Sequence, residues 1–289
     1  MSQPYRLAEG GTIDRSRPLD FRFDGRGYQG YEGDTLASAL LANGVRLLGR
    51  SFKYHRPRGI ATAGAAEPNA LVELRAGARR EPNSRATEIP LFAGLEARSQ
   101  HRWPSLRFDI MSLNNRFSAL MPAGFYYKTF MWPAKAWPSY EKIIRRAAGL
   151  GRGGLEPDPD AYERMNAHCD VLVVGGGPAG LAAALAAGRS GARVVLLDAE
   201  DDFGGALRGE REAIDGAPAQ DWVRGAASEL AKLPEVTLLH RTSAFGLYDD
   251  NLVGAVERVC DHLAEPPPDA VRQRYWKLRA GRVVLATGA

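Results

Sequence analysis

Residues 170–180 read Asp-Val-Leu-Val-Val-Gly-Gly-Gly-Pro-Ala-Gly, and this stretch decides the fold of the second half of the chain. The apolar run before the glycines is typical of a strand buried on both faces of a parallel sheet. Gly175 permits a tight turn, Gly177 lets the backbone approach a pyrophosphate closely, and Gly180 lets the following helix pack against the strand. Glycines in this strand–loop–helix context predict a dinucleotide-binding site.

An acidic residue follows where such a site requires one. Asp198 lies eighteen residues after Gly180, at the end of the next predicted strand. Its carboxylate can accept hydrogen bonds from both ribose hydroxyls and would repel a 2′-phosphate, so NAD or FAD is favoured over NADP. The N-terminus of the helix directs free N–H groups and a partial positive charge at the phosphates. The glycines alone do not separate NAD from FAD, because both carry an adenosine ribose and a pyrophosphate.

The rest of the second half alternates between strands and helices. We expect strands over 170–174, 192–197 and 236–239, helices over 181–189 and 217–230, and two further strand-like runs within 275–285. This alternation predicts an α/β domain of the Rossmann type, built on a doubly wound parallel sheet.

The last eight residues, 282–289, read Arg-Val-Val-Leu-Ala-Thr-Gly-Ala. They resemble the second signature of flavoprotein reductases with two dinucleotide-binding domains, an apolar strand that ends in Ala-Thr-Gly near the cofactor, and Gly204-Gly205 fits the same family. In that family the chain continues beyond this strand, so we expect the domain to be incomplete and the chain to be truncated or a fragment. No catalytic residue or metal ligand is assigned. The predicted cofactor-binding residues are Gly175, Gly177, Pro178, Ala179, Gly180, Asp198, Ala199, Glu200, Gly205, Ala206, Ala244, Thr287 and Gly288.

The N-terminal part has another order of elements. It comprises a strand over 19–23, a hairpin turn at Asp24-Gly25, a strand over 28–31, a helix capped by Asp34 and ended by Asn43-Gly44, a polar, basic loop over 49–64 and a strand over 70–74, with 87–91 as one more candidate strand. The order strand, hairpin, helix, loop, strand is that of a β-grasp, or ferredoxin-like, unit.

An irregular connector joins the two parts. It carries Trp103, Trp132 and Trp137 between prolines, and a disordered linker would lack such aromatic residues. We therefore expect it to wrap over a surface and bury those rings. The predicted domains are a β-grasp domain at 1–94, the connector at 95–166 and a truncated FAD/NAD(P)-binding domain at 167–289.

Composition excludes several classes of protein. Of 289 residues, 45% are hydrophobic and 25% are charged, as in ordinary globular proteins. Residues 1–166 carry 25 basic and 17 acidic side chains (+8) and residues 167–289 carry 13 and 17 (−4), which sums to the net charge of +4. The basic charge is scattered and no recognition motif accompanies it, so we expect no nucleic-acid partner. The polar start has no apolar segment of a secretory signal, and we expect a cytoplasmic protein without a membrane partner.

Several longer segments resemble the N-terminal part of the α subunit of heterotetrameric sarcosine oxidases. They are residues 49–59 (Gly-Arg-Ser-Phe-Lys-Tyr-His-Arg-Pro-Arg-Gly), 67–70, 99–105, 124–131 and 147–151, followed by the glycine fingerprint. Related subunits of amine and opine dehydrogenases and of hydrogen cyanide synthase carry iron–sulfur cysteines in the loop after the helix. The two cysteines of this chain, Cys169 and Cys260, lie outside that loop, and thiolates are needed to hold such a cluster. We therefore expect a β-grasp unit without a cluster or another metal.

The resemblance implies an enzyme that oxidatively demethylates sarcosine to glycine, releases hydrogen peroxide and passes a one-carbon unit to tetrahydrofolate. It implies NAD bound by this chain, FMN at a subunit boundary, FAD in the β subunit and a folate-binding domain beyond this stretch. The implied partners are the β, γ and δ subunits of a heterotetramer.

Two alternatives stay open. The chain could instead be the FAD-binding subunit of an opine or amino-acid dehydrogenase, or a non-catalytic interaction subunit with a structural nucleotide. The basic loop with Lys53, His55, Arg56 and Arg58 faces either a flavin phosphate, an acidic partner or solvent. Two roles are open for Tyr126, Tyr127 and Lys128: they either pack within the protein, or they line a subunit interface or a tunnel.

Overall fold

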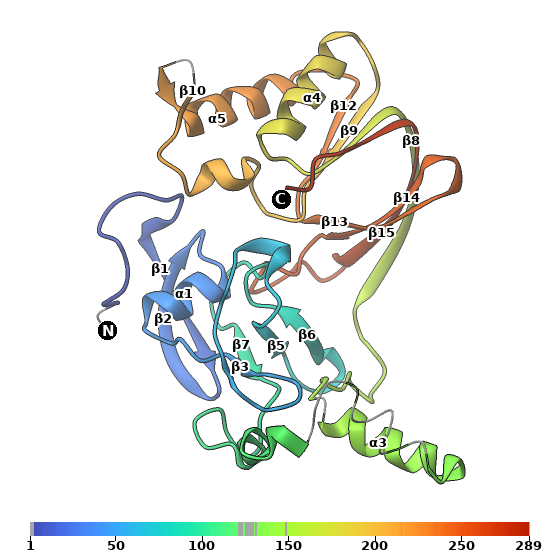
Figure 1. Cartoon of the computed structure of the whole chain (residues 1–289). Coiled ribbons are helices and arrows are strands. Elements are labelled where there is room, and N and C mark those ends of the chain that lie inside the picture. Colours follow the sequence, from blue (N-terminus) through green and yellow to red (C-terminus); the bar gives the residue numbers. More distant parts are fainter. Residues whose placement is uncertain are drawn as a thin grey trace. The chain divides into compact units, whose positions relative to one another are not determined.

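The computed structural model describes residues 3–120, 124, 130, 132–147, 149–214 and 216–288, the side chains of 146 and 147 excepted. The chain forms two compact units, Met1–Ala8 with Ile13–Pro159 and Glu9–Thr12 with Asp160–Ala289 (Figure 1). The predicted limits of the three segments remain predictions. Strand β7 (Glu96–Ser99) nevertheless belongs to the sheet of the first unit, and strand β8 (Ala161–Val174) begins before residue 167.

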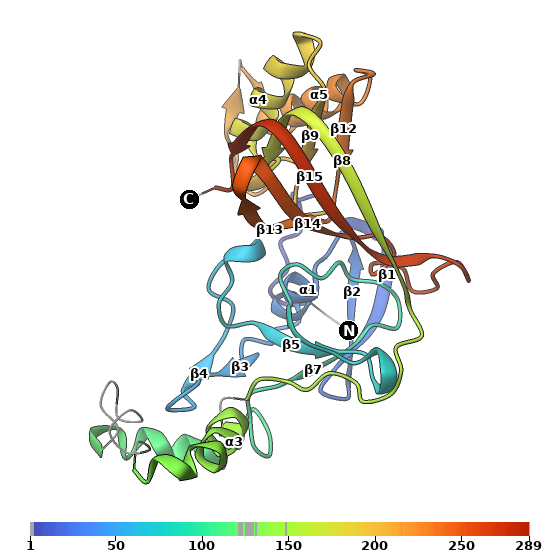
Figure 2. The same cartoon turned by 90° about the vertical axis from the view of Figure 1, so that its right-hand side faces the viewer.

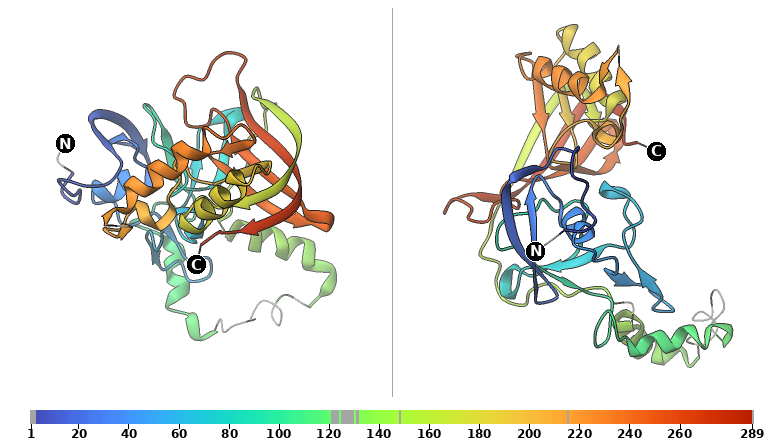
Figure 3. Two further views of the ribbon diagram at one scale, coloured as in Figure 1. Left: turned by 90° about the horizontal axis from the view of Figure 1, so that it is seen from above. Right: turned by 90° about the vertical axis from the view of Figure 1, so that its left-hand side faces the viewer.

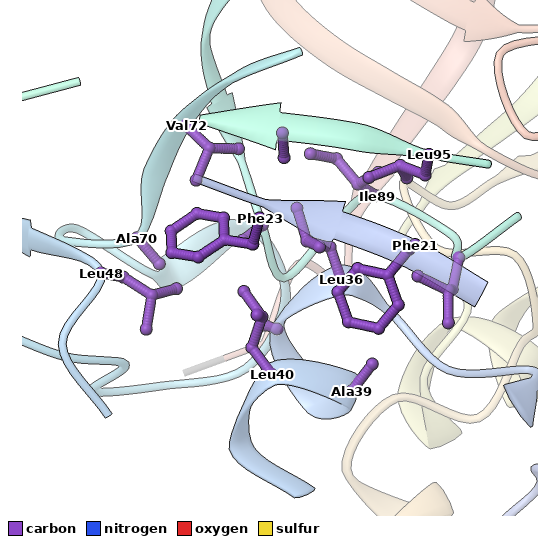
Figure 4. Close-up of a cluster of buried hydrophobic side chains, with 14 of the residues drawn as sticks. Phe21, Phe23, Leu36, Ala39, Leu40, Leu48, Ala70, Val72, Ile89 and Leu95 are labelled. Atoms are coloured by element: carbon purple, nitrogen blue, oxygen red, sulfur yellow. The ribbon is translucent and has the colours of Figure 1, made fainter. Parts of the chain in front are cut away.

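The first unit is a five-stranded sheet with one helix against it. The sheet has the order β2-β1-β7-β5-β6, made of β1 (Asp14–Phe23), β2 (Arg26–Glu32), β5 (Leu71–Leu74), β6 (Glu81–Arg85) and β7. Strands β1 and β2 form the predicted hairpin, with Asp24 and Gly25 at positive φ in its turn. Helix α1 (Leu36–Ala42) packs Leu36 and Leu40 against Phe21 and Phe23 of β1 (Figure 4).

Two predictions in this unit are wrong in detail. The N-cap of α1 is Thr35, whose hydroxyl accepts from the Ser38 N–H while the Ser38 side chain accepts from the Thr35 N–H. Asp34 is buried instead, and its carboxylate accepts from Arg6 and from the Tyr31 N–H. Residues 87–91 form no strand because their N–H and C=O groups bond to α1 and its flanks, as in Leu36 N–H to Ile89 C=O.

The described part of the connector does not bury its tryptophan rings. It contains short 3-10 turns, η3 (Ile110–Asn115), η4 (Ser118–Leu120) and η5 (Ala134–Ala136), and helix α3 (Trp137–Ala147). Trp103, Trp132 and Trp137 are 59%, 83% and 46% exposed. The expectation of buried rings is therefore wrong for these three tryptophans. The connector contributes Leu106 to the buried core of the first unit instead. Residues 126–128 lie outside the described residues.

The second unit contains a six-stranded sheet of order β12-β9-β8-β15-β14-β13. Strands β8, β9 (Val194–Leu197), β12 (Val236–Leu239) and β15 (Val271–Leu285) are parallel, while β14 (Leu252–Arg258) and β13 (Thr242–Tyr248) return antiparallel. Figure 2 shows β8 and β15 side by side over their length. Residues 275–285 therefore lie in one strand rather than two, and the hairpin β13–β14 was not predicted.

Helices α4 (Pro178–Arg189) and α5 (Ala219–Leu230) lie side by side (Figure 3). Both contribute to one buried cluster, with Leu181 and Leu230 among its members. A second cluster, around Leu172 and Leu278, consists of residues of the strands. The α/β class of the unit is confirmed, whereas helices on both faces, as a doubly wound sheet has them, are not seen in the described residues. The minor elements are β3 (Gly49–Arg50), β4 (Pro57–Arg58), η1 (Gly64–Ala66), η2 (Gly77–Arg79), η6 (Gly205–Arg208), β10 (Ala213–Ile214), β11 (Ala217–Pro218) and η7 (Asp249–Asn251).

Candidate functional site

Two glycines of the loop between β8 and α4 are required by the packing of the protein itself. Gly175 has a φ of +103°, and a Cβ at this position would overlap the carbonyl group of Ala286. A Cβ at Gly180 would overlap the carbonyl oxygen of Gly175. These contacts bring the end of β15 and the first turn of α4 against the loop, as the sequence pattern predicts.

Gly177 differs from these two glycines. Its φ of −70° and ψ of −175° are accessible to any residue. The nearest neighbour of a Cβ built there would be the Cα of Gly205, at 4.0 Å. No packing within the described protein therefore demands a glycine here. The missing side chain leaves free space beside the start of α4, where the backbone can approach a ligand.

Several backbone N–H groups around this space have no partner among the described residues. Helix α4 begins at Pro178 without a side-chain cap, and the first intrahelical bond joins the Leu181 N–H to the Gly177 carbonyl. The N–H groups of Ala179 and Gly180 therefore have no acceptor in the part of the chain that the structure describes. The 3-10 turn η6 begins opposite Gly177 and also has no side-chain cap. Free N–H groups at a helix N-terminus form a binding site for phosphate.

The carboxylate of Asp198 is linked to the glycine loop. Its Oδ2 accepts from the Gly176 N–H at 2.5 Å, and its Oδ1 accepts from the Glu200 N–H at 2.8 Å. The two bonds fix the carboxylate at the end of β9, and because each oxygen can accept a second hydrogen bond, capacity remains for ribose hydroxyls. The structure thus brings Asp198 to the loop that holds Gly177.

The other predicted positions lie around these groups. The Thr287 N–H group lies next to Gly175. Ala199 and Glu200 follow Asp198, and the Ala199 carbonyl accepts from Arg258 at 2.7 Å. Ala244 lies on β13, whose first residue donates its N–H to the Asp198 carbonyl at 2.6 Å. Gly205 and Ala206 begin η6, and the exposed Gly288 has a φ of +86°.

Sequence reasoning missed Phe203 and the bond from Gly176 to Asp198. Phe203 is buried, and a Cβ at Gly176 would overlap its ring. The middle glycine of the triplet is thus explained by an aromatic residue rather than by a ligand. The available signal in the sequence was an aromatic residue, Phe203, between the polar Asp202 and Gly204.

His262 lies near Asp201 of the loop after Asp198, and its side chain is partly buried. Burial lowers the pKa of His262, and the charge of Arg241 lowers it further. Its Nδ1 is buried and has no hydrogen-bond partner among the described residues. Arg241 itself forms an ion pair with Asp201. The Arg241 N–H also donates to the Glu200 carbonyl at 2.9 Å, so Arg241 is bonded to the loop after Asp198 at two points.

In the first unit, the loop after α1 is filled by the protein's own side chains. Glu67 is buried, and its carboxylate accepts from the N–H groups of Ala61, Thr62, Asn69 and Ala70 at 2.6–3.2 Å. Burial raises the pKa of Glu67, but the four N–H bonds together hold it below its ordinary value.

The basic loop at 51–58 also bonds within the chain. His55 is turned inward, and its Nδ1 donates to the buried carboxylate of Asp109 at 2.8 Å. Lys53 and Arg56 both lie against the ring of Tyr54. Whether Lys53, Arg56 and Arg58 face a flavin phosphate or a partner stays a prediction.

Two known families match parts of the chain. Residues 16–102 match a family described as "2Fe-2S iron-sulfur cluster binding domain", and residues 170–246 match one described as "FAD dependent oxidoreductase". The second match contains the glycine loop, Asp198 and Ala244. The two matches lie in separate parts of the chain, the first in the N-terminal unit and the second in the unit that contains β8 and α4.

Sarcosine oxidase subunit alpha of Rhizobium meliloti (strain 1021) is 60% identical over 99% of this chain. The subunit of the same name from Corynebacterium sp. (strain P-1) is 40% identical over 99% of the chain. The chain is a homologue of the N-terminal part of sarcosine oxidase α subunits. It spans 29% and 25% of the lengths of these two relatives.

A solved structure has a fold similar to that of this chain. L-proline dehydrogenase from P. horikoshii has a TM-score of 0.54 and 22% identity, over 96% of this chain and 42% of that one. At this identity the likeness concerns the fold alone.

The match to a 2Fe-2S domain raises the question of whether a cluster fits. Such clusters are held by cysteine thiolates. Residues 16–102 of the present chain contain no cysteine. Among the described residues, no group of His, Cys, Asp or Glu side chains is suited to hold a metal ion. The residues of the matched segment do not fit an iron–sulfur cluster. No helix among those described is both long and apolar enough to span a membrane.

Proposed function

We propose that this protein binds the ADP part of a dinucleotide at the loop between β8 and α4, and that the dinucleotide is NAD. The observation that carries the proposal is the free space at Gly177, beside N–H groups without partners and within the same loop as Asp198. The N–H groups of Ala179 and Gly180 would hold the pyrophosphate, and Asp198 would accept from the ribose hydroxyls. A nicotinamide ring, when bound, supplies hydride transfer.

The relatives support a proposal for the activity of the whole protein. Two relatives that span this chain are named as α subunits of sarcosine oxidase. We infer that the whole protein is an oxidoreductase acting on the CH–NH group of sarcosine, which gives glycine, hydrogen peroxide and a one-carbon unit for tetrahydrofolate. Within it, this chain binds and orients a nucleotide, while FMN, FAD and the folate site depend on other parts of a cytoplasmic heterotetramer with β, γ and δ subunits.

A second candidate is FAD in place of NAD. It is favoured by the description of the family that matches residues 170–246. Both cofactors share the ADP part that the glycine loop and Asp198 would hold, so the nature of the second half decides between them.

The first unit is proposed to be a β-grasp domain without a cluster. Its matched segment has no cysteine, and the buried carboxylates of Glu67 and Asp109 bond to the loop after α1, through the Ala61 N–H and His55. The second unit is proposed to belong to a doubly wound domain.

The test is to purify the protein, denature it and identify the released nucleotide by mass spectrometry and absorbance. Colourless protein that releases NAD supports the proposal. Yellow protein that releases FAD supports the second candidate. Protein that carries neither nucleotide and binds neither when it is added contradicts both.

A further inference from the structure

Residues 103–109 are firmly anchored to the first unit. Leu106 is buried in its core, and the Leu106 carbonyl accepts from Nε of Arg50 at 3.0 Å. Asp109 is buried beside His55, at 2.8 Å, with the Arg50 guanidinium 3.6 Å away. A buried carboxylate held by two basic groups fixes the backbone on which it lies.

The turns that follow are held to the same place. Asp109 accepts from the Met111 N–H at the start of η3, and the Ile110 N–H donates to the Trp103 carbonyl at 2.8 Å. At the end of η3, Asn115 accepts from Nε of Arg56 at 2.7 Å. The backbone of 103–115 is therefore supported at both ends of η3.

Large apolar side chains of residues 103–120, and that of Phe52 in the loop that also contains Arg56, are exposed to solvent. We call the set the aromatic platform: Phe52, Trp103, Phe108, Leu113, Phe117 and Leu120. All six are more than half exposed, with Phe108 at 68% and Leu120 at 77%. Isolated exposed apolar residues are ordinary, but several on one short supported segment mark an interaction site.

The charge around the platform has one sign. Residues 97–140 contain one carboxylate, that of Asp109, and it is buried. Arg107 and Arg116 lie within the platform segment and are exposed. The accessible charge of this segment is therefore positive, and it complements an acidic surface.

We propose that the aromatic platform docks another protein chain, whose contact surface has apolar pockets for the rings and acidic groups at its rim. Aromatic residues and arginine are enriched in protein–protein interfaces, whereas Asp and Glu are depleted, as in this segment. An anionic membrane fits less well, because the platform lies on short 3-10 turns rather than on a long amphipathic helix. That the partner is another subunit of the same complex rests on the proposed function.

The test uses the full-length protein produced together with the remaining subunits of its complex. Three variants are compared with the wild type: Phe108→Ser with Phe117→Ser, Arg107→Glu with Arg116→Glu, and Leu155→Ser as the control. Leu155 is fully exposed, lies in the same unit and is outside the platform. Subunit affinity is measured by native mass spectrometry and sedimentation, and nucleotide content is measured in each sample.

The double serine variant is expected to lose about 100-fold or more in affinity, as for two central interface residues. The double glutamate variant is expected to lose roughly 3- to 10-fold and to depend less on salt than the wild type. The control and all nucleotide contents stay unchanged.

Wild-type affinity in both platform variants would overturn the inference. So would binding of the platform to phosphatidylserine vesicles while subunit affinity stays intact. Wild-type protein that assembles normally but carries and binds no nucleotide would instead contradict the proposed function, so the two failures are distinguishable.

Discussion

The loop around Glu67 and the glycine loop of the second unit use backbone N–H groups in opposite ways. In the first loop, four N–H groups donate to one buried carboxylate of the protein. In the second loop, Asp198 accepts from the Gly176 N–H, while those of Ala179 and Gly180, beside Gly177, have no acceptor among the described residues. The first loop uses its donors within the protein, whereas the proposed function assigns the donors of the second loop to the phosphates of a ligand.

This difference separates a family match from a binding site. Residues 16–102 match a cluster-binding family, but their loops are satisfied by Glu67 and Asp109 and contain no thiolate. Residues 170–246 match the family described as "FAD dependent oxidoreductase", and the Ala179 and Gly180 N–H groups there have no acceptor among the described residues. Donors without partners indicate a site more directly than likeness of sequence does.

The largest effect is expected from Glu67→Ala. Each buried N–H group left unsatisfied costs about 1–3 kcal/mol, so the free energy of unfolding of the first unit should fall by about 3 kcal/mol or more. Hydrogen–deuterium exchange of peptides from the first unit at increasing urea concentrations measures it. The control Asp14→Ala removes an exposed carboxylate that also bonds to its own backbone, and it should shift the curve far less. Equal shifts would contradict the role given to Glu67.

The same residue predicts a pH dependence. Because the folded pKa of Glu67 is lowered, its contribution to stability is complete above the ordinary pKa of 4.5 and is lost as the pH falls through the folded value. The difference in stability between wild type and Glu67→Ala should therefore shrink in acid. A constant difference down to pH 3 would contradict this.

The next effect is that of Gly177→Val on the glycine loop. The backbone at Gly177 accepts a side chain, so the fold should be unchanged, while the valine fills the space for the phosphates. Overpacking costs about 1–3 kcal/mol, which predicts dinucleotide affinity about 10- to 100-fold weaker by calorimetry. Gly180→Ala is the contrast, because its Cβ overlaps Gly175 and should lower the melting temperature. A Gly177→Val protein that binds normally would exclude this space as the site.

A smaller loss is expected from Asp198→Asn. The amide oxygen can still accept from the Gly176 N–H, but the charge that favours the ribose hydroxyls is gone. Hydrogen bonds to charged groups contribute about 1.5–3 kcal/mol, so partial loss should weaken binding about tenfold. If the Asp198→Asn variant bound NAD as tightly as the wild type, Asp198 would only support the loop and would not contact the ribose.

The smallest effect concerns the exposed pair of Asp170 and Arg193, which touches neither loop. Hydrogen bonds from the Arg193 side chain and N–H lower the pKa of Asp170 to about 2. Arg193→Gln should return it toward 3.8 in a carboxyl NMR titration. Stability from this pair is present above pH 3.8 and is lost toward pH 2. A pKa that does not move would show that Arg193 is not its cause.

The sequence predicted the parts of the fold with strong local signals. The apolar run before Gly175, the helix after it and Asp198 at the end of β9 all lie where periodicity and glycine chemistry put them. The hairpin β13–β14 was missed, because it pairs through long-range contacts with β15 that no local pattern reveals. The cap at Thr35 was missed because Asp34 has the same capping chemistry and is taken up by Arg6. Phe203 was missed because its role depends on contact with Gly176.

The most direct measurement of the contrast between the two loops is hydrogen–deuterium exchange of the full protein with and without dinucleotide. The account predicts slower exchange on addition of NAD in peptides covering 175–186 and 198–207, and no change in a peptide covering 59–71. The same experiment on Gly177→Val should show no protection at matched nucleotide concentration. Unchanged exchange at 175–186, or equal protection at 59–71, would contradict the claim that the glycine loop is the one the protein leaves open for its ligand.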